Sequence, residues 1–159
     1  MDENSQKTFD NIFQAHRLKL SNYEKDNDNR SRDLTKWFNV KNKGEKFAFK
    51  SFPYYHDKRR IQNRVKILKE IHDWQNIIRF YGITTDGNSC YLVTEWAEYG
   101  NLREFYENNN DSFDLKLKLR VSLDIARGLN FLRTVEVTTK TFYIIEIITW
   151  LFTVFIQYA

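Results

Sequence analysis

The sequence is poor in cysteine and histidine, and this scarcity excludes several classes of protein. A single cysteine, Cys90, rules out an internal disulfide framework and a cysteine-rich zinc site. The three histidines, His16, His56 and His72, lack the spacing of metal ligands and are interpreted as surface or boundary residues. We therefore predict no metal site in this chain.

The chain also lacks a long basic arm and an apolar segment at its start. Its formal charge is only +4, and basic residues alternate with acidic ones, so no nucleic-acid partner is predicted. The opening MDENSQKTFD is polar, unlike a signal peptide, which makes a cytoplasmic, reducing location the default expectation. What the chain does have is 42% hydrophobic and 16% aromatic residues, enough to bury a core.

The first half of the chain predicts a tail, a hairpin and a helix. Residues 1–33 end in the charged run EKDNDNRSRD and are predicted to form a polar tail or loop. Two β-forming runs then flank the sequence NKGE, which predicts a hairpin with Gly44 at the positive-φ position and Pro53 ending its second strand. Residues 57–71 change to a helical period, with an apolar stripe at Ile61, Val65, Leu68 and Ile71.

The second half predicts another hairpin followed by helices. Apolar runs at 77–83 and 89–96 flank an Asp-Gly turn. A short helix after Gly100 has Asn101 as its expected cap, and a helix over 115–132 is apolar on more than one side. Because the helices follow an antiparallel sheet, the fold class is predicted to be α+β.

Four segments follow one another in a recognisable order: FAFK at 47–50, NIIRFYG at 76–82, YLVTEW at 91–96 followed by YGNL at 99–102, and LDIARGLNFL at 123–132. Together and in this register they resemble the eukaryotic protein kinases, particularly the tyrosine-kinase-like branch. The resemblance implies a partial protein-kinase-like domain over residues 34–136. This domain would contain the small lobe (an antiparallel sheet plus the regulatory helix), the hinge and the first helices of the large lobe, so the fold would be incomplete.

The resemblance also implies which residues would contact ATP. Side chains alternate along a strand, so Ala48 and Lys50 share one face. In the family, the small residue lies over the adenine and the lysine reaches the α- and β-phosphates. The alternative for Lys50 is an ordinary core-strand lysine that snorkels to water. Thr94 would be the gatekeeper, while Glu95 through its carbonyl, and Ala97 through its carbonyl and N–H, would bond the adenine.

Three departures from the family pattern argue against catalysis. No glycine precedes Gly44, although the family's glycine-rich loop should lie roughly fifteen to twenty residues before Lys50. Arg64 stands where the regulatory helix should carry a glutamate, and we expect it to turn to solvent or to bind a phosphate; a shifted register of the helix is the alternative. After Arg133 the sequence leaves the H-R-D and D-F-G pattern, so no catalytic residue and no magnesium ligand is predicted.

Residues 137–159 form a hydrophobic C-terminal tail of unknown role. Its apolar part, 141–159, fits a membrane anchor, an aggregation-prone strand or unrelated sequence appended where a kinase reading frame was interrupted. We favour the third interpretation over membrane association, and we expect exposed apolar surface on the helix over 115–132.

The predicted function is that of an inactive kinase-like fragment, a pseudokinase or a truncated product, with weak or lost ATP binding and a protein partner. Magnesium is not expected to be held. One alternative is that the chain represents an active Ser/Thr or Tyr protein kinase whose large lobe is missing. The other alternative is a tail-anchored membrane protein.

Overall fold

The structure is a computed structural model of the chain, and it describes residues 11, 14–27, 34–53, 58–71, 77–87, 89–100, 102–109 and 113–134. The chain divides into two compact units. The first comprises residues 1–69 and 79–96, and the second comprises residues 70–78 and 97–159. The predicted tail over 137–159 and the predicted cap Asn101 lie outside the described residues.

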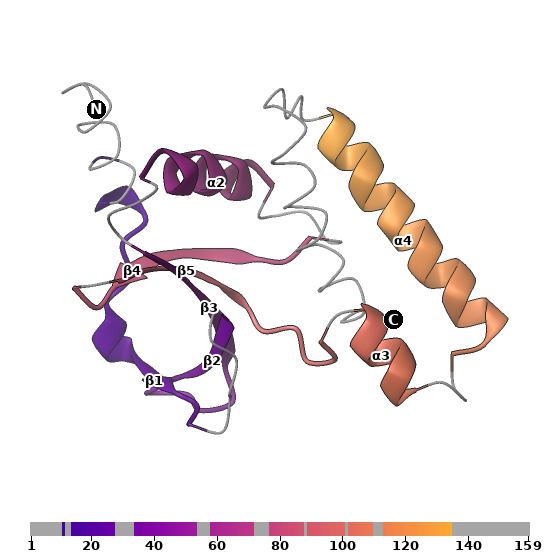
Figure 1. Cartoon of the computed structure of the whole chain (residues 1–159), viewed down its shortest axis with the longest axis horizontal. Helices are drawn as coiled ribbons and strands as arrows, with labels where there is room; N and C mark the ends of the chain where they lie inside the picture. The colour runs from indigo at the N-terminus through magenta and orange to yellow at the C-terminus, as the bar shows by residue number, and fades with distance from the viewer. Residues whose placement is uncertain are drawn as a thin grey trace. The chain divides into compact units, whose positions relative to one another are not determined.

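The first unit contains a five-stranded antiparallel sheet with the strand order β1-β2-β3-β5-β4 (Figure 1). A short 3₁₀ helix, η1 (Leu20–Asn22), precedes the first strand. The strands are β1 (Tyr23–Lys25), β2 (Leu34–Asn39), β3 (Lys46–Pro53), β4 (Phe80–Thr85) and β5 (Ser89–Glu95). Helix α2 (Lys58–Ile71) lies along one face of this sheet (Figure 1). These elements confirm the predicted α+β class, both hairpins and the helix.

Helix α2 forms where the sequence shows a helical period, and it buries its apolar stripe. All four predicted stripe residues are at most 4% exposed: Ile61, Val65, Leu68 and Ile71. Apolar side chains three and four residues apart lie on one side of a helix, which here is the side that packs in the core. The helix has no acidic residue in its first turn.

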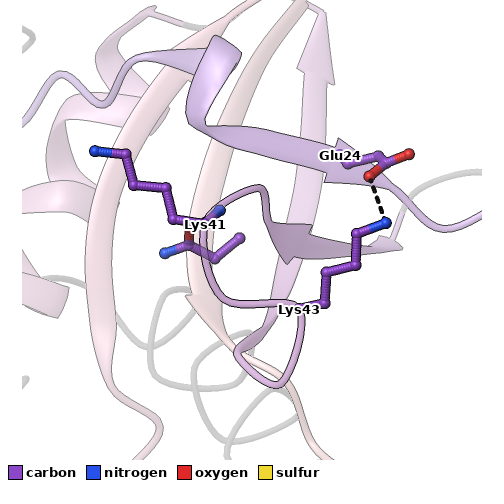
Figure 2. Close-up of polar contacts among 4 residues, drawn as sticks. Glu24, Lys41 and Lys43 are labelled. Carbon is purple, nitrogen blue, oxygen red and sulfur yellow. Dashed lines mark hydrogen bonds and ion pairs between the residues drawn. The ribbon is translucent and has the colours of Figure 1, made fainter.

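The turn between β2 and β3 differs from the prediction in one respect. Gly44 is not among the described glycines with positive φ, so its freedom to adopt that conformation is not what forms the turn. Instead, the Asn42 side chain accepts the Gly44 N–H at 3.2 Å and donates to the Glu45 carboxylate at 3.1 Å. An Asn side chain can replace a backbone acceptor in a turn. Lys43 of the same turn forms an ion pair with Glu24 of β1 at 3.5 Å (Figure 2).

Part of the predicted polar tail belongs to the sheet. Residues 16–25, termed the N-terminal strap, begin along the outer edge of β4, where Ile83 donates to the His16 carbonyl at 2.9 Å and accepts from the Leu18 N–H at 2.7 Å. The strap ends as β1, which pairs with β2 at the opposite edge. In between, it packs on the buried cluster of Phe47, Phe49 and Val93. The strap therefore covers the sheet face opposite α2.

The second unit contains α3 (Leu102–Asn108) and α4 (Leu115–Thr134), and α4 confirms the long helix predicted over 115–132. Asp114 caps α4, since its carboxylate accepts the Leu117 N–H at 2.8 Å. Four leucines on α4 are between 39% and 70% exposed: Leu115, Leu119, Leu123 and Leu129. This confirms the predicted exposed apolar surface. None of the described helices is both long and apolar enough to cross a membrane.

Candidate functional site

Four of the five predicted site residues lie on two neighbouring strands of the first unit. Ala48 and Lys50 are on β3, and Thr94 and Glu95 are on β5. Ala48 is directly opposite Thr94 in the β3–β5 ladder. Directly opposite residues project from the same face, so these two side chains lie side by side. Both are buried, with 4% of Ala48 and none of Thr94 exposed.

Lys50 lies on the same face, one step along β3 from Ala48. It is half-buried, and its partners in the ladders are Leu34 on β2 and Leu92 on β5. The position fits both sequence interpretations, because a lysine in an apolar row can extend its ammonium into a site or into water. Helix α2 packs on this face, and it carries Arg64 at the position where the kinases that the sequence resembles have a glutamate.

Arg64 of α2 lies over the Phe52 ring, with its guanidinium carbon 4.8 Å from the ring centroid. This distance is in the range of a cation–π interaction. Phe52 shares its face with Lys50, two residues back along β3. Arg64 is half-buried, so it has not turned fully to solvent. Its guanidinium adds a positive charge to the face that carries Lys50.

The two backbone positions predicted to contact adenine are engaged in different ways. Glu95 donates its N–H to the Arg79 carbonyl at 2.9 Å, and its own carbonyl accepts the Thr94 hydroxyl at 3.3 Å. Ala97 belongs to the second unit, where its carbonyl accepts the Gly100 N–H at 3.3 Å. The roles of all five residues in ATP binding stay predictions.

A cluster around Lys36 was not predicted from the sequence. Lys36 on β2 is directly opposite Ala48 and so shares its face. Its ammonium lies 3.7 Å from the Asp26 carboxylate and 5.4 Å from the ring centroids of both Phe38 and Trp96. Alternation along β2 is enough to predict that Lys36 and Phe38 share one face. The position of Lys36 beside Ala48 could not be predicted in this way, because it depends on the register of the β2–β3 hairpin.

The connection between β1 and β2, residues 26–33, lies where the glycine-rich loop was expected. Its described part begins with Asp26, whose N–H donates to the Lys36 carbonyl at 2.9 Å. An acidic residue at this place would repel phosphates. Residues 28–33 lie outside the described part of the chain.

Cys90 lies on β5 opposite Phe52, on the face that carries Lys50. Burial raises the pKa of this thiol to about 12, and none of the residue is exposed. Only the thiolate is a good nucleophile, so Cys90 is a core residue at neutral pH and not a reactive one. In the described part of the chain, no three or more His, Cys, Asp or Glu residues cluster in a way that could hold a metal ion.

Comparison with known families agrees with this strand and helix arrangement. The family model described as protein tyrosine and serine/threonine kinase matches residues 33–141, more than half of the chain. The chain belongs to this family. Protein kinases use ATP and magnesium in general, and the antiparallel sheet with α2 is the kinase small lobe, followed by an incomplete large lobe.

Individual kinases are similar over part of the chain. The dual specificity protein kinase splA of Dictyostelium discoideum is 37% identical over 79 residues, which is 45% of this chain and 3% of that protein. The probable serine/threonine-protein kinase SIS8 of Arabidopsis thaliana is 33% identical over 74 residues, 46% of this chain and 7% of that protein. The tyrosine-protein kinase Fer of Rattus norvegicus is 34% identical over 67 residues, 42% of this chain and 8% of that protein. The matched segments are thus a small part of each of these relatives.

Proposed function

We propose that this chain is a pseudokinase-like module whose small lobe keeps a weak, magnesium-independent contact with ATP. The observation that carries the proposal is the charge on one face of the sheet. Lys50 shares the face of Ala48 and Thr94, as an ATP-binding lysine would, whereas α2 places Arg64 over Phe52 of that face. Two cations attract phosphate oxygens, but they repel a magnesium ion.

The sequence of α2 supports a loss of catalysis, because Arg64 stands where the family has a glutamate. In active kinases, a glutamate of the regulatory helix holds the lysine, and two further groups hold magnesium. The only acidic residue of α2 is Glu70, which is exposed and lies more than a turn from Arg64. Residues 133–159 also contain no H-R-D or D-F-G sequence. Phosphoryl transfer depends on positioned metal and charge neutralisation, so we expect none from these 159 residues.

Nucleotide titration of the purified chain tests the proposal. We expect ATP to bind weakly, with the same affinity in magnesium and in EDTA, in isothermal calorimetry. Lys50→Ala should weaken binding roughly tenfold, because it removes a charge-assisted contact to phosphate. Lys41→Ala is the matched control, since it removes an exposed lysine of the same hairpin. Strong magnesium-dependent binding, or phosphate transfer abolished by Lys50→Ala, would contradict the proposal.

The names of the relatives favour a second candidate. Those described above are named as serine/threonine-, tyrosine- or dual specificity kinases. On this view, the chain represents an active kinase whose large lobe is missing. Reading the coding DNA beyond codon 136 in all frames decides the matter: an H-R-D-like sequence supports an active parent, and its absence removes the idea.

The proposed module would act in the cytoplasm through a protein partner. The single cysteine supports this location, and the exposed leucines of α4 support a partner. Carbonate extraction of membranes, with and without residues 141–159, separates this proposal from the tail-anchored alternative.

A further inference from the structure

The side chain of Lys36 reaches across the strand that carries Ala48. Lys36 is on β2, and Trp96 directly follows β5, while β3 lies between these two strands. The ammonium nevertheless lies 5.4 Å from the centre of the Trp96 ring. The contact between them therefore bridges β3. Lys36 is directly opposite Ala48, whereas Phe38 is opposite Lys46 and Trp96 follows the partner of Phe47, so the bridge runs from beside Ala48 towards the Lys46 end of β3.

Several groups hold the ammonium in this position. Asp26 provides a carboxylate at 3.7 Å, and the rings of Phe38 and Trp96 provide two π faces. The side chains of Lys36 and Asp26 are only 21% and 17% exposed, so this ion pair is better shielded from solvent than that of Lys43 and Glu24, at 76% and 60%. Shielding from water strengthens both an ion pair and a cation–π interaction.

The cluster has a consequence for ligands. An adenine ring stacked on Ala48 would need that side chain to be accessible, yet Ala48 is only 4% exposed. Lys50, two residues further along β3, is half-buried. The base end of the proposed site is thus buried and has Lys36 directly beside it, whereas the phosphate end carries Lys50 and Arg64.

We infer that Lys36 is a built-in occupant of the base-binding surface, so that the small lobe takes phosphate anions without recognising a base. The inference rests on the proposed function, since it assumes that Ala48 and Lys50 mark the remnant of a nucleotide site. The ligand class is a linear polyphosphate group, whether free or part of a nucleotide. A base contributes to binding only after the Lys36 side chain has left Ala48.

Two probes without magnesium test this inference on the full chain: ATP and inorganic tripolyphosphate, titrated in EDTA by calorimetry. For the unchanged protein, we expect the two affinities to agree within about threefold, because both ligands offer the same phosphate charge. Lys36→Ala should raise the affinity for ATP roughly 10- to 100-fold, since stacking on the exposed surface becomes available. The affinity for tripolyphosphate should not rise.

Two further variants show whether an effect of Lys36→Ala is specific to the position of Lys36. Lys41→Ala removes an equal charge from an exposed lysine of the same hairpin, whose side chain extends away from Glu24 in Figure 2, and should leave the ratio of the affinities unchanged. Asp26→Asn removes the carboxylate while keeping the lysine intact, and should raise the ATP affinity by less than Lys36→Ala does. Thermal unfolding monitored by circular dichroism shows whether Lys36→Ala folds. If it does not fold, Asp26→Asn takes its place as the test variant.

The outcomes separate this inference from the proposed function. A selective gain for ATP in Lys36→Ala supports the inference. An unchanged protein that already prefers ATP to tripolyphosphate more than about tenfold overturns the inference and leaves the proposed function standing. The inference also fails if Lys36→Ala changes both affinities equally. If neither probe binds to the unchanged protein or to any variant, the proposed function fails as well.

Discussion

At the scale of single residues, burial sets the chemistry of the face that α2 covers. Cys90 lies there without any exposed surface, and burial raises the pKa of its thiol to about 12 from an ordinary value of 9.0. On the β4–β5 hairpin, burial and the hydrogen bond that Tyr91 donates to Asp86 at 2.6 Å raise the pKa of Tyr91 to about 12. Both groups are therefore neutral in the folded protein over a range in which they ionise in the unfolded chain.

These pKa shifts predict how stability depends on pH. An acid whose pKa is raised by folding contributes stability below its unfolded pKa, and this contribution is lost as pH rises towards the folded pKa. The free energy of unfolding should thus fall from about pH 9, with a slope from the thiol approaching roughly 1.4 kcal/mol per pH unit. Urea titrations between pH 8 and 10 check this, and Cys90→Ala should remove most of the slope. A slope that persists in that variant would assign the effect to other groups.

At the scale of elements, the N-terminal strap depends on Gly82 in β4. Gly82 has φ +154°, and a Cβ there would lie 2.5 Å from the His16 carbonyl oxygen and 3.0 Å from Leu18 Cγ. The β4–β5 register shifts at the same place, between Phe80 and Gly82. The glycine thus allows the strap to run along the edge of β4, which also covers backbone groups that would otherwise invite pairing with another chain.

Replacing this glycine should release the strap. We expect Gly82→Ala to lower the free energy of unfolding by roughly 1–3 kcal/mol, because both φ and the close contact become unfavourable. Hydrogen exchange should then increase in residues 16–25. Gly87→Ala is the matched control, since Gly87 has φ +96° but nothing within 4 Å of its would-be Cβ. Equal exchange in the strap of both variants would show that close approach at Gly82 does not hold it.

The helices and strands were predictable wherever the apolar periodicity of the sequence extends over enough residues to be recognised. Helix α2, helix α4 and both hairpins follow from their apolar patterns, and alternation alone placed Ala48 and Lys50 on one face. The strap was not predictable, because its strand β1 has three residues and its apolar side chains follow no period. The Lys36 cluster was missed since it depends on the β2–β3 register and on a contact with Trp96, which is distant in sequence. At Gly44, the prediction overlooked that the Asn42 side chain could form the turn.

At the scale of the whole molecule, the two units differ in how completely they cover their apolar residues. The first unit buries its sheet on both faces, under α2 on one side and under the strap on the other. The second unit has a long helix on which Val121 is 3% exposed while leucines on other positions remain accessible. Three of these exposed leucines, Leu115, Leu119 and Leu123, are four residues apart and so form a continuous stripe on the helix. A stripe of this kind favours association with another surface.

The stripe predicts poor solubility of the isolated chain and a way to relieve it. We expect the purified protein to associate at micromolar concentration in analytical ultracentrifugation and to bind the dye ANS. Leu119→Lys combined with Leu123→Lys should reduce both, because these positions are 63% and 50% exposed and accept a charge without burying it. The same variant should unfold at the same urea concentration, whereas Val121→Lys, at a buried position of the same helix, should lose stability. A monodisperse chain that binds no ANS before any substitution would contradict the expectation, and it would mean that the leucines of α4 are covered in solution.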